Sequence, residues 1–326
     1  MLQYLIIQLD DTSNSYCHYS NDKKESRLIS VENLKKGILF AMKENLMIQF
    51  VYPDFELSQE YKDAINTIDH SDIVPSNCKD DVLKNNADII IFNNWKELES
   101  YEIKEDGIYV IRTSKSELFE RHSLLNKILT VAKRINVVIT DIDSFDENDF
   151  EKYKEILSSL SKETEKLYVE GKTPQLNLLT DRMMLDKMNN CNAGDENITL
   201  APDGKFYVCP AFYQAETATT IEVKAQCIGD LKSGLNVRNP QLYKLSHAPI
   251  CRNCDAYQCK RCVWLNRKMT LEVNTPSHEQ CIVAHTERNV SHNLLQNISK
   301  QGVFMSEIEI KEIAYLDPFE NKEEWQ

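Results

Sequence analysis

The chain has 326 residues, enough for one large domain or two ordinary ones, and its 42 % hydrophobic content is sufficient for packed cores. Its 38 Lys and Arg against 51 Asp and Glu give a net charge of -13, which repels phosphate groups and disfavours nucleic-acid binding. No run approaches the roughly 18 apolar residues of a membrane span, and the first residues read as a β-strand and not as a signal peptide. We therefore expect a globular cytoplasmic protein that binds neither nucleic acid nor a membrane.

The first 180 residues alternate short β-like runs with amphipathic stretches. The predicted strands are residues 4–9, 47–52, 87–92, 107–112, 136–140 and 175–179. Apolar residues spaced three and four apart predict helices over residues 31–44, 58–68, 117–134 and 148–168. Such alternation is typical of a mainly parallel sheet with crossover helices. The sequence thus predicts an α/β fold, open or curled into a partial (β/α) barrel.

The character of the chain changes near residue 180. Cysteines begin, helical periodicity weakens, and turn-forming pairs such as Asp203 and Gly204 appear. We expect residues 1–180 to form the α/β domain and residues 181–300 to form a cysteine-rich domain that ends in a helix from residue 278. The acidic residues 301–326 are expected to form a loosely held tail.

Eight of the ten cysteines lie between residues 191 and 281, which in a chain without a secretion signal indicates metal binding and not a disulfide framework. A tight turn between cysteines two residues apart can point both sulfurs at one metal. Residues 198–209 predict a β-hairpin that delivers one thiol at its end. Seven thiols follow one ordered pattern: Cys191, Gly204-x4-Cys209, Cys251-x2-Cys254-x4-Cys259-x2-Cys262 and Cys281.

Spacing alone leaves the metal open. Four cysteines in two pairs would suit a structural zinc ion, and a larger set of thiols would equally suit iron-sulfur clusters. Inert buried thiols have no reason to fall into such pairs.

The ordered pattern resembles the SPASM domain of radical-SAM peptide-modifying enzymes, a module that holds auxiliary 4Fe-4S clusters. The family spaces its central four cysteines x2, x5, x3, so the tighter x2, x4, x2 spacing here could alter or replace one cluster. The resemblance implies one cluster on Cys251, Cys254, Cys259 and Cys281 and a second on Cys191, Cys209 and Cys262. The second cluster then lacks a fourth ligand, for which Cys227 is the nearest candidate; the alternative is an open iron available to a peptide thiolate or a small molecule.

A radical-SAM barrel usually precedes a SPASM domain, and the N-terminal domain has the size and element order of one. That superfamily holds its S-adenosylmethionine cluster on a CxxxCxxC motif after the first strand, but here Cys17 is followed by Asn21 and Lys24 at the other two positions. The GGE-like end of the second strand is replaced by residues 50–56, Phe-Val-Tyr-Pro-Asp-Phe-Glu. The resemblance implies no S-adenosylmethionine cluster, and Cys17 is left as a relic, a substrate-contacting thiol, a ligand shared across an interface or a plain loop cysteine.

Residues 9–19 and 251–266 resemble the CXXX repeat peptide maturase family. That family is associated with a true radical-SAM enzyme and a short precursor with repeated Cys-x-x-x units. The resemblance implies an accessory iron-sulfur subunit that forms a hetero-oligomer with the radical-SAM enzyme and acts in substrate binding, electron transfer or both. The alternative is a zinc-stabilised peptide-binding adaptor without redox chemistry.

Overall fold

A computed structural model describes residues 2–17, 21–23, 25–215 and 227–303 of the chain. Within these ranges eleven strands form one sheet, in the order β11-β10-β9-β8-β1-β2-β3-β4-β5-β6-β7. The predicted tail lies outside the described residues from residue 304 onward. The strands are β1 (Tyr4–Gln8), β2 (Met47–Val51), β3 (His70–Pro75), β4 (Ile89–Phe92), β5 (Ile108–Thr113), β6 (Arg134–Ile139), β7 (Gln175–Leu176), β8 (Asn197–Leu200), β9 (Lys205–Tyr207), β10 (Cys227–Asp230) and β11 (Gly234–Leu235).

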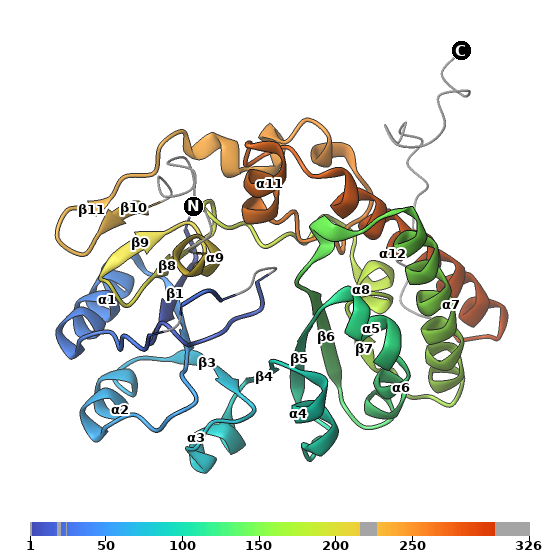
Figure 1. Cartoon of the computed structure of the whole chain (residues 1–326), viewed down its shortest axis with the longest axis horizontal. Helices are drawn as coiled ribbons and strands as arrows, with labels where there is room; N and C mark the ends of the chain where they lie inside the picture. The colour runs from blue at the N-terminus through green and yellow to red at the C-terminus, as the bar shows by residue number, and fades with distance from the viewer. Residues whose placement is uncertain (1, 18–20, 24, 216–226, 304–326) are drawn as a thin grey trace.

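Strands β1 to β7 pair in parallel with their neighbours in chain order, and helices connect most of them. The sheet curves into an arch with α1 to α6 on its outer side (Figure 1). The helices are α1 (Val31–Glu44), α2 (Gln59–Ile65), α3 (Asp81–Asn86), α4 (Trp95–Ser100), α5 (Lys115–Arg121), α6 (Ser123–Leu129), α7 (Glu147–Val169), α8 (Thr180–Met184), α9 (Pro210–Gln214), α11 (Val263–Thr270) and α12 (His278–Lys300), with the 3-10 turns η1 (Ile142–Ser144), η2 (Pro240–Tyr243), η3 (Leu245–His247) and η4 (Cys251–Asn253). The predicted α/β fold with a partial barrel is confirmed.

Both faces of the parallel strands are buried, as expected for a sheet covered on each side. The outer face joins the helices in the main core, where Ile7, Phe50 and Ile111 are fully buried. The inner face carries a separate apolar layer to which each of the first six strands contributes one residue. This layer consists of Ile6, Val51, Ile73, Ile91, Val110 and Val138.

The sheet continues across residue 180 into the cysteine-rich part. β8 pairs in parallel with β1, with Ile7 opposite Leu200, and then forms an antiparallel hairpin with β9. Gly204 has φ +78 in the hairpin turn, a conformation that favours glycine. The predicted hairpin is therefore present, and it places the chain that follows it beside the first strand.

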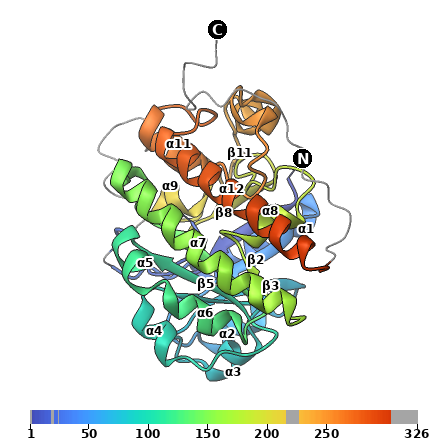
Figure 2. The same ribbon diagram turned by 90° about the vertical axis from the view of Figure 1, so that its right-hand side faces the viewer.

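The C-terminal part crosses the open side of the arch (Figure 1). Its last helix among the described residues is α12, which packs along α7 (Figure 2). The helix predicted from residue 278 is present, and its N-cap Ser277 accepts a hydrogen bond from the Gln280 amide at 3.2 Å.

The main differences from the prediction concern β3 and the helix predicted for residues 117–134, and the short helices α3 and α4 were not predicted either. β3 is absent from the predicted strands because its first three residues are polar, and only its second half is buried. The single helix predicted for residues 117–134 is two helices that meet at His122, and Arg134 starts β6.

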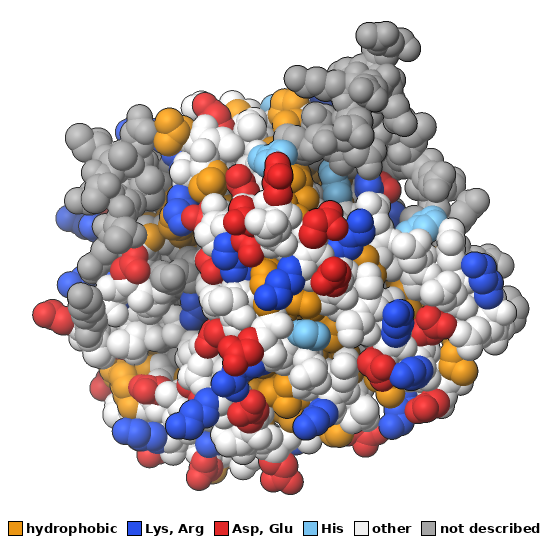
Figure 3. Space-filling model, turned by 45° about the vertical axis from the view of Figure 1, so that its right-hand side comes forward, with side chains coloured by type: hydrophobic (Ala, Val, Ile, Leu, Met, Phe, Trp, Pro, Cys, Tyr) orange, Lys and Arg blue, Asp and Glu red, His pale blue; other side chains and the backbone are white. Residues whose placement is uncertain are grey.

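None of the described helices is long and apolar enough to cross a membrane. Acidic and basic side chains alternate over the face in Figure 3 without a patch of one sign.

Candidate metal centres

Four cysteines of the C-terminal part surround one small pocket. Cys251, Cys254, Cys259 and Cys281 all line it, among mainly apolar neighbours. The amide of Cys254 donates to the carbonyl oxygen of Cys251 at 3.1 Å, which closes the CxxC turn at η4. Cys281 lies in the first turn of α12. We name this group of four thiols the first site.

Thiolates at the first site would repel one another. Burial raises the pKa of Cys251 to about 11, and the neighbouring Cys254 adds to the increase. Burial also raises the pKa of Cys259 well above its usual value, with further increases from Cys251, Cys254 and Cys281. The thiolate form, which binds metals, would therefore need a multivalent cation in the pocket.

Polar groups approach the sulfur of Cys254 from two sides. The backbone amide of Ala256 donates to this sulfur at 3.4 Å, and Nε2 of His285 on α12 lies at 3.4 Å from it. Hydrogen bonds of this kind stabilise a thiolate and tune a metal that it binds.

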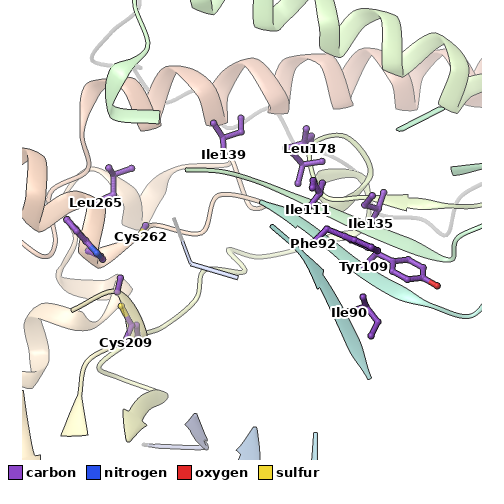
Figure 4. Close-up of a cluster of buried hydrophobic side chains, with 14 of the residues drawn as sticks. Ile90, Phe92, Tyr109, Ile111, Ile135, Ile139, Leu178, Cys209, Cys262 and Leu265 are labelled. Atoms are coloured by element: carbon purple, nitrogen blue, oxygen red, sulfur yellow. The ribbon is translucent and has the colours of Figure 1, made fainter. Parts of the chain in front are cut away.

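Cys191, Cys209 and Cys262 meet at a second place, and Cys17 from the loop after β1 joins them. All four thiols line one cavity on the inner side of the barrel. The side chains of Cys17 and Cys209 are hydrogen-bonded to each other. Figure 4 shows Cys209 and Cys262 close to Leu265 at one end of the hydrophobic core, on two separate segments of the chain. We name this group the second site.

The pKa values of the four thiols at the second site are shifted in different directions. Burial raises the pKa of Cys191, Cys209 and Cys262, although the Leu265 amide at the start of α11 opposes the increase at Cys262. The pKa of Cys17 is lowered, chiefly by its hydrogen bond with Cys209. Cys209 and Cys262 are the N-caps of α9 and α11, where the positive end of a helix favours a thiolate.

The loop after β1 turns back into the barrel and carries Cys17 to the second site. Asn14 Nδ2 donates to Asn93 Oδ1 at 3.1 Å, where β4 ends, and Arg112 donates to the same oxygen at 3.1 Å. The hydroxyl of Tyr16 donates to Gln49 Oε1 of β2 at 3.1 Å. In Figure 1 this loop crosses the middle of the arch. It therefore occupies the interior at the carboxyl ends of the strands, where barrels present functional groups.

Two further cysteines lie apart from both sites. Cys227 begins β10, is exposed, and lines a separate surface pocket, with its sulfur 3.4 Å from the Gly229 carbonyl oxygen. Cys78 is buried after β3. The structure thus does not bring Cys227 to the other predicted ligands and places Cys17 there instead. The only signal in the sequence was a lone cysteine in the loop after the first strand.

Arg261 lies between the two sites and is buried, with an exposed fraction of 2 %. Its positive charge acts to lower the pKa of Cys251 at the first site and of Cys191 at the second. One guanidinium nitrogen donates to the Tyr243 carbonyl oxygen at 2.5 Å, while Nε and Nη1 have no hydrogen-bond partner among the described residues. Sulfur atoms of iron-sulfur clusters accept hydrogen bonds, so these two donors fit clusters held at the sites.

No group of three or more Cys, His, Asp or Glu side chains in the described ranges is arranged to hold a single metal ion. The thiols of each site line the wall of a space instead. Their number, sulfur chemistry and burial fit the ligand sets of 4Fe-4S clusters.

The cavity at the second site has a volume of about 370 Å³. The inner face of the barrel, including Ile6, Val110 and Val138, lines this cavity together with the four thiols. Asn190 also lines it, and both polar atoms of its side chain are buried without a hydrogen-bond partner among the described residues. The cavity therefore joins apolar surface, an unsatisfied amide and a group of thiols.

The arrangement of a partial barrel and a cysteine-rich C-terminal part is similar in fold to two solved structures. A structure of histidine-tagged anSMEcpe with bound AdoMet superposes with a TM-score of 0.60 at 10 % identity, over 94 % of this chain and 97 % of that one. Native anSMEcpe with bound AdoMet and Cp18Cys peptide gives a TM-score of 0.59 at 10 % identity, over 92 % and 100 %. No protein-family model matches the sequence. No curated protein matches it significantly.

Proposed function

We propose that this chain is an iron-sulfur partner subunit in the maturation of a ribosomally synthesised peptide with Cys-x-x-x repeats. It would form a hetero-oligomer with a true radical-SAM enzyme and serve in substrate binding, electron transfer or both. The main support for the proposal is the second site, a group of four thiols on the wall of a cavity inside the barrel.

The loop after β1 supports an accessory role. Asn21 stands where the superfamily has a cluster ligand, and its side-chain amide donates to the Asp11 carbonyl oxygen at 2.8 Å. Its Oδ1 accepts from the Lys23 amide at 3.0 Å, so Asn21 stabilises a turn of the protein itself. Lys24, at the other replaced position, lies outside the described residues. Radical initiation would then come from the partner enzyme.

The end of β2 also supports an accessory role. Tyr52 follows the strand and is buried, and burial together with Asp72 raises the pKa of its hydroxyl. A buried aromatic side chain takes the place of the small glycines through which the family approaches S-adenosylmethionine. We infer that this chain does not bind that cofactor productively.

The cavity fits a stretch of peptide. An asparagine side chain offers one acceptor and two donors, which match the N–H and C=O of a peptide backbone. Asn190 has these groups free of described partners and lies beside the apolar inner layer, so a bound peptide would satisfy them and bury its own apolar groups. The similar fold of anSMEcpe is solved with a peptide, and we extend peptide binding to this chain as a proposal.

Each of the two sites would hold one 4Fe-4S cluster on its cysteines. When bound, the clusters supply one-electron transfer. The protein's own residues keep the sites dry and charge-balanced: apolar side chains line the first site, and Arg261 supplies a buried positive charge between the two.

The test is binding of a labelled synthetic peptide with repeated Cys-x-x-x units to anaerobically purified protein, followed by fluorescence anisotropy. We expect the wild type to bind the peptide and Asn190→Leu to bind it about tenfold more weakly. The substitution removes the amide group of Asn190, so buried polar groups of the peptide lose hydrogen bonds worth about 1 kcal/mol or more. The same substitution at Asn86, exposed on α3, is the control and should leave binding unchanged.

Modification of that peptide by the partner radical-SAM enzyme should require this chain. Zinc in place of iron, with peptide binding intact, would favour the adaptor function without redox chemistry. Absence of peptide binding in both the wild type and the complex with the partner enzyme would contradict the proposal.

A further inference from the structure

The second site contains a fourth thiol from a distant part of the chain. Cys191, Cys209 and Cys262 belong to the ordered cysteine pattern of the C-terminal part. The resemblance of this pattern to SPASM domains implies a fourth ligand beside these three. Cys17 comes from the loop after β1 and lines the same cavity as these three. Its thiol is hydrogen-bonded to that of Cys209.

The topology of the sheet explains why these segments meet. β1 lies between β2 and β8 and is parallel to both. The loop after β1 returns into the barrel, where Gln214 Nε2 donates to the Ser13 carbonyl oxygen at 2.5 Å and the Tyr213 hydroxyl donates to Asp11 Oδ1 at 2.5 Å. Tyr213 and Gln214 belong to α9, the helix capped by Cys209. These hydrogen bonds therefore hold the loop and α9 together close to Cys17 and Cys209.

Polar groups surround the sulfur of Cys17. The Ser15 hydroxyl lies 3.2 Å from the Cys17 sulfur, and the Ala211 amide of α9 donates to it. Arg112 contributes a positive charge from the inner face of β5. The Cys17 sulfur is therefore held in place inside the cavity, where groups that would also hydrogen-bond a cluster ligand surround it.

We propose that Cys17 is the fourth thiolate ligand of the second iron-sulfur site, together with Cys191, Cys209 and Cys262. The inference rests on the proposed iron-sulfur function. Each thiol loses its proton to solvent when it binds, so the site carries four thiolates and leaves no iron open. The loop that in radical-SAM enzymes serves the S-adenosylmethionine cluster would here serve an auxiliary one.

Full ligation decides between two roles of the second site. A peptide cysteine could bind only by displacing one of the four thiolates, whereas electron transfer needs no open position. We therefore infer that the peptide passes beside the site without ligating it.

The experiment compares anaerobically purified wild type with Cys17→Ala, and with Cys227→Ala as the matched control. Iron and sulfide per chain and the electron paramagnetic resonance spectrum of the reduced protein are measured. We expect Cys17→Ala to lose up to half of the iron and one of two cluster signals, while Cys227→Ala matches the wild type. An unchanged iron content and spectrum in Cys17→Ala would overturn the ligand assignment.

Alkylation of the unmutated protein provides a second measurement that does not depend on folding of a variant. Cys17 should resist iodoacetamide in the loaded protein and react after the metal is removed with a chelator and an oxidant, as read by mass spectrometry, whereas exposed Cys227 reacts in both states. Reaction of Cys17 in the loaded protein would overturn the assignment. A wild type without iron would instead overturn the iron-sulfur function itself, and the ligand role of Cys17 with it.

Discussion

Glu287 is a buried carboxyl group on α12 whose replacement should change how stability depends on pH. The Tyr153 hydroxyl of α7 donates to its Oε1 at 2.7 Å, and Gln258 Nε2 donates to its Oε2 at 3.3 Å. Burial raises its pKa from 4.5 to about 7, against the opposing effect of these two hydrogen bonds. Glu287 thus joins α7, α12 and the segment that carries the first site.

The raised pKa predicts the sign of the effect. Below pH 4.5 both the folded and the unfolded chain hold the proton on Glu287. As the pH rises towards 7, the unfolded chain releases this proton while the folded chain keeps it, so the free energy of unfolding falls. The loss amounts to about 3 kcal/mol over this window and levels off above the folded pKa.

Glu287→Gln removes the titration and retains a side-chain oxygen that can accept from Tyr153. Urea unfolding followed by circular dichroism between about pH 5 and pH 8 should show the variant gaining about 2 to 3 kcal/mol on the wild type across this range. Glu155→Gln, at an exposed position of α7, is the control, and its free energy of unfolding should depend on pH in the same way as that of the wild type. If the free energy of unfolding of Glu287→Gln has the same pH dependence as that of the wild type, the Glu287 carboxyl group does not cause the loss of stability between about pH 5 and pH 8.

Three further substitutions test other parts of the structure. Cys254→Ala should halve the iron content and lower the free energy of unfolding, because ligation and folding are coupled; metal analysis and urea unfolding check this, and unchanged iron would remove Cys254 from the first site. Arg261→Gln should make the cluster reduction potentials more negative, because it removes a buried positive charge; a redox titration that gives equal potentials would contradict this. Gly194→Ala should cost about 1 to 3 kcal/mol in urea unfolding, because Gly194 has φ +84 and a Cβ would lie 2.6 Å from Tyr243; an unaffected midpoint would count against it.

The parallel sheet could be predicted because most of its strands are short apolar runs between amphipathic helices. β3 could not, since His70, Ser71 and Asp72 supply the polar first half of a strand whose last residues alone are buried. The break between α5 and α6 at His122 also escaped prediction, because the apolar spacing continues across it.

The family resemblance implied the four thiols of the first site, and they come from a CxxC turn, a nearby cysteine and the start of a helix. The second site was accessible only in part. Cys227 is close to Cys209 in the sequence, but it lies at the start of β10, away from the second site. Cys17 is far from Cys209 in the sequence, but the parallel pairing of β1 with β8 brings the two together. Contacts made by sheet topology leave no spacing pattern in a single sequence.

The proposed function depends on whether the two groups of thiols hold iron-sulfur clusters. Anaerobic purification followed by iron, acid-labile sulfide and zinc analysis, with an absorption spectrum, answers this question. We predict about eight iron and eight sulfide per chain, with broad visible absorption that decreases on reduction. Stoichiometric zinc without iron or sulfide would exclude the clusters and leave a structural adaptor.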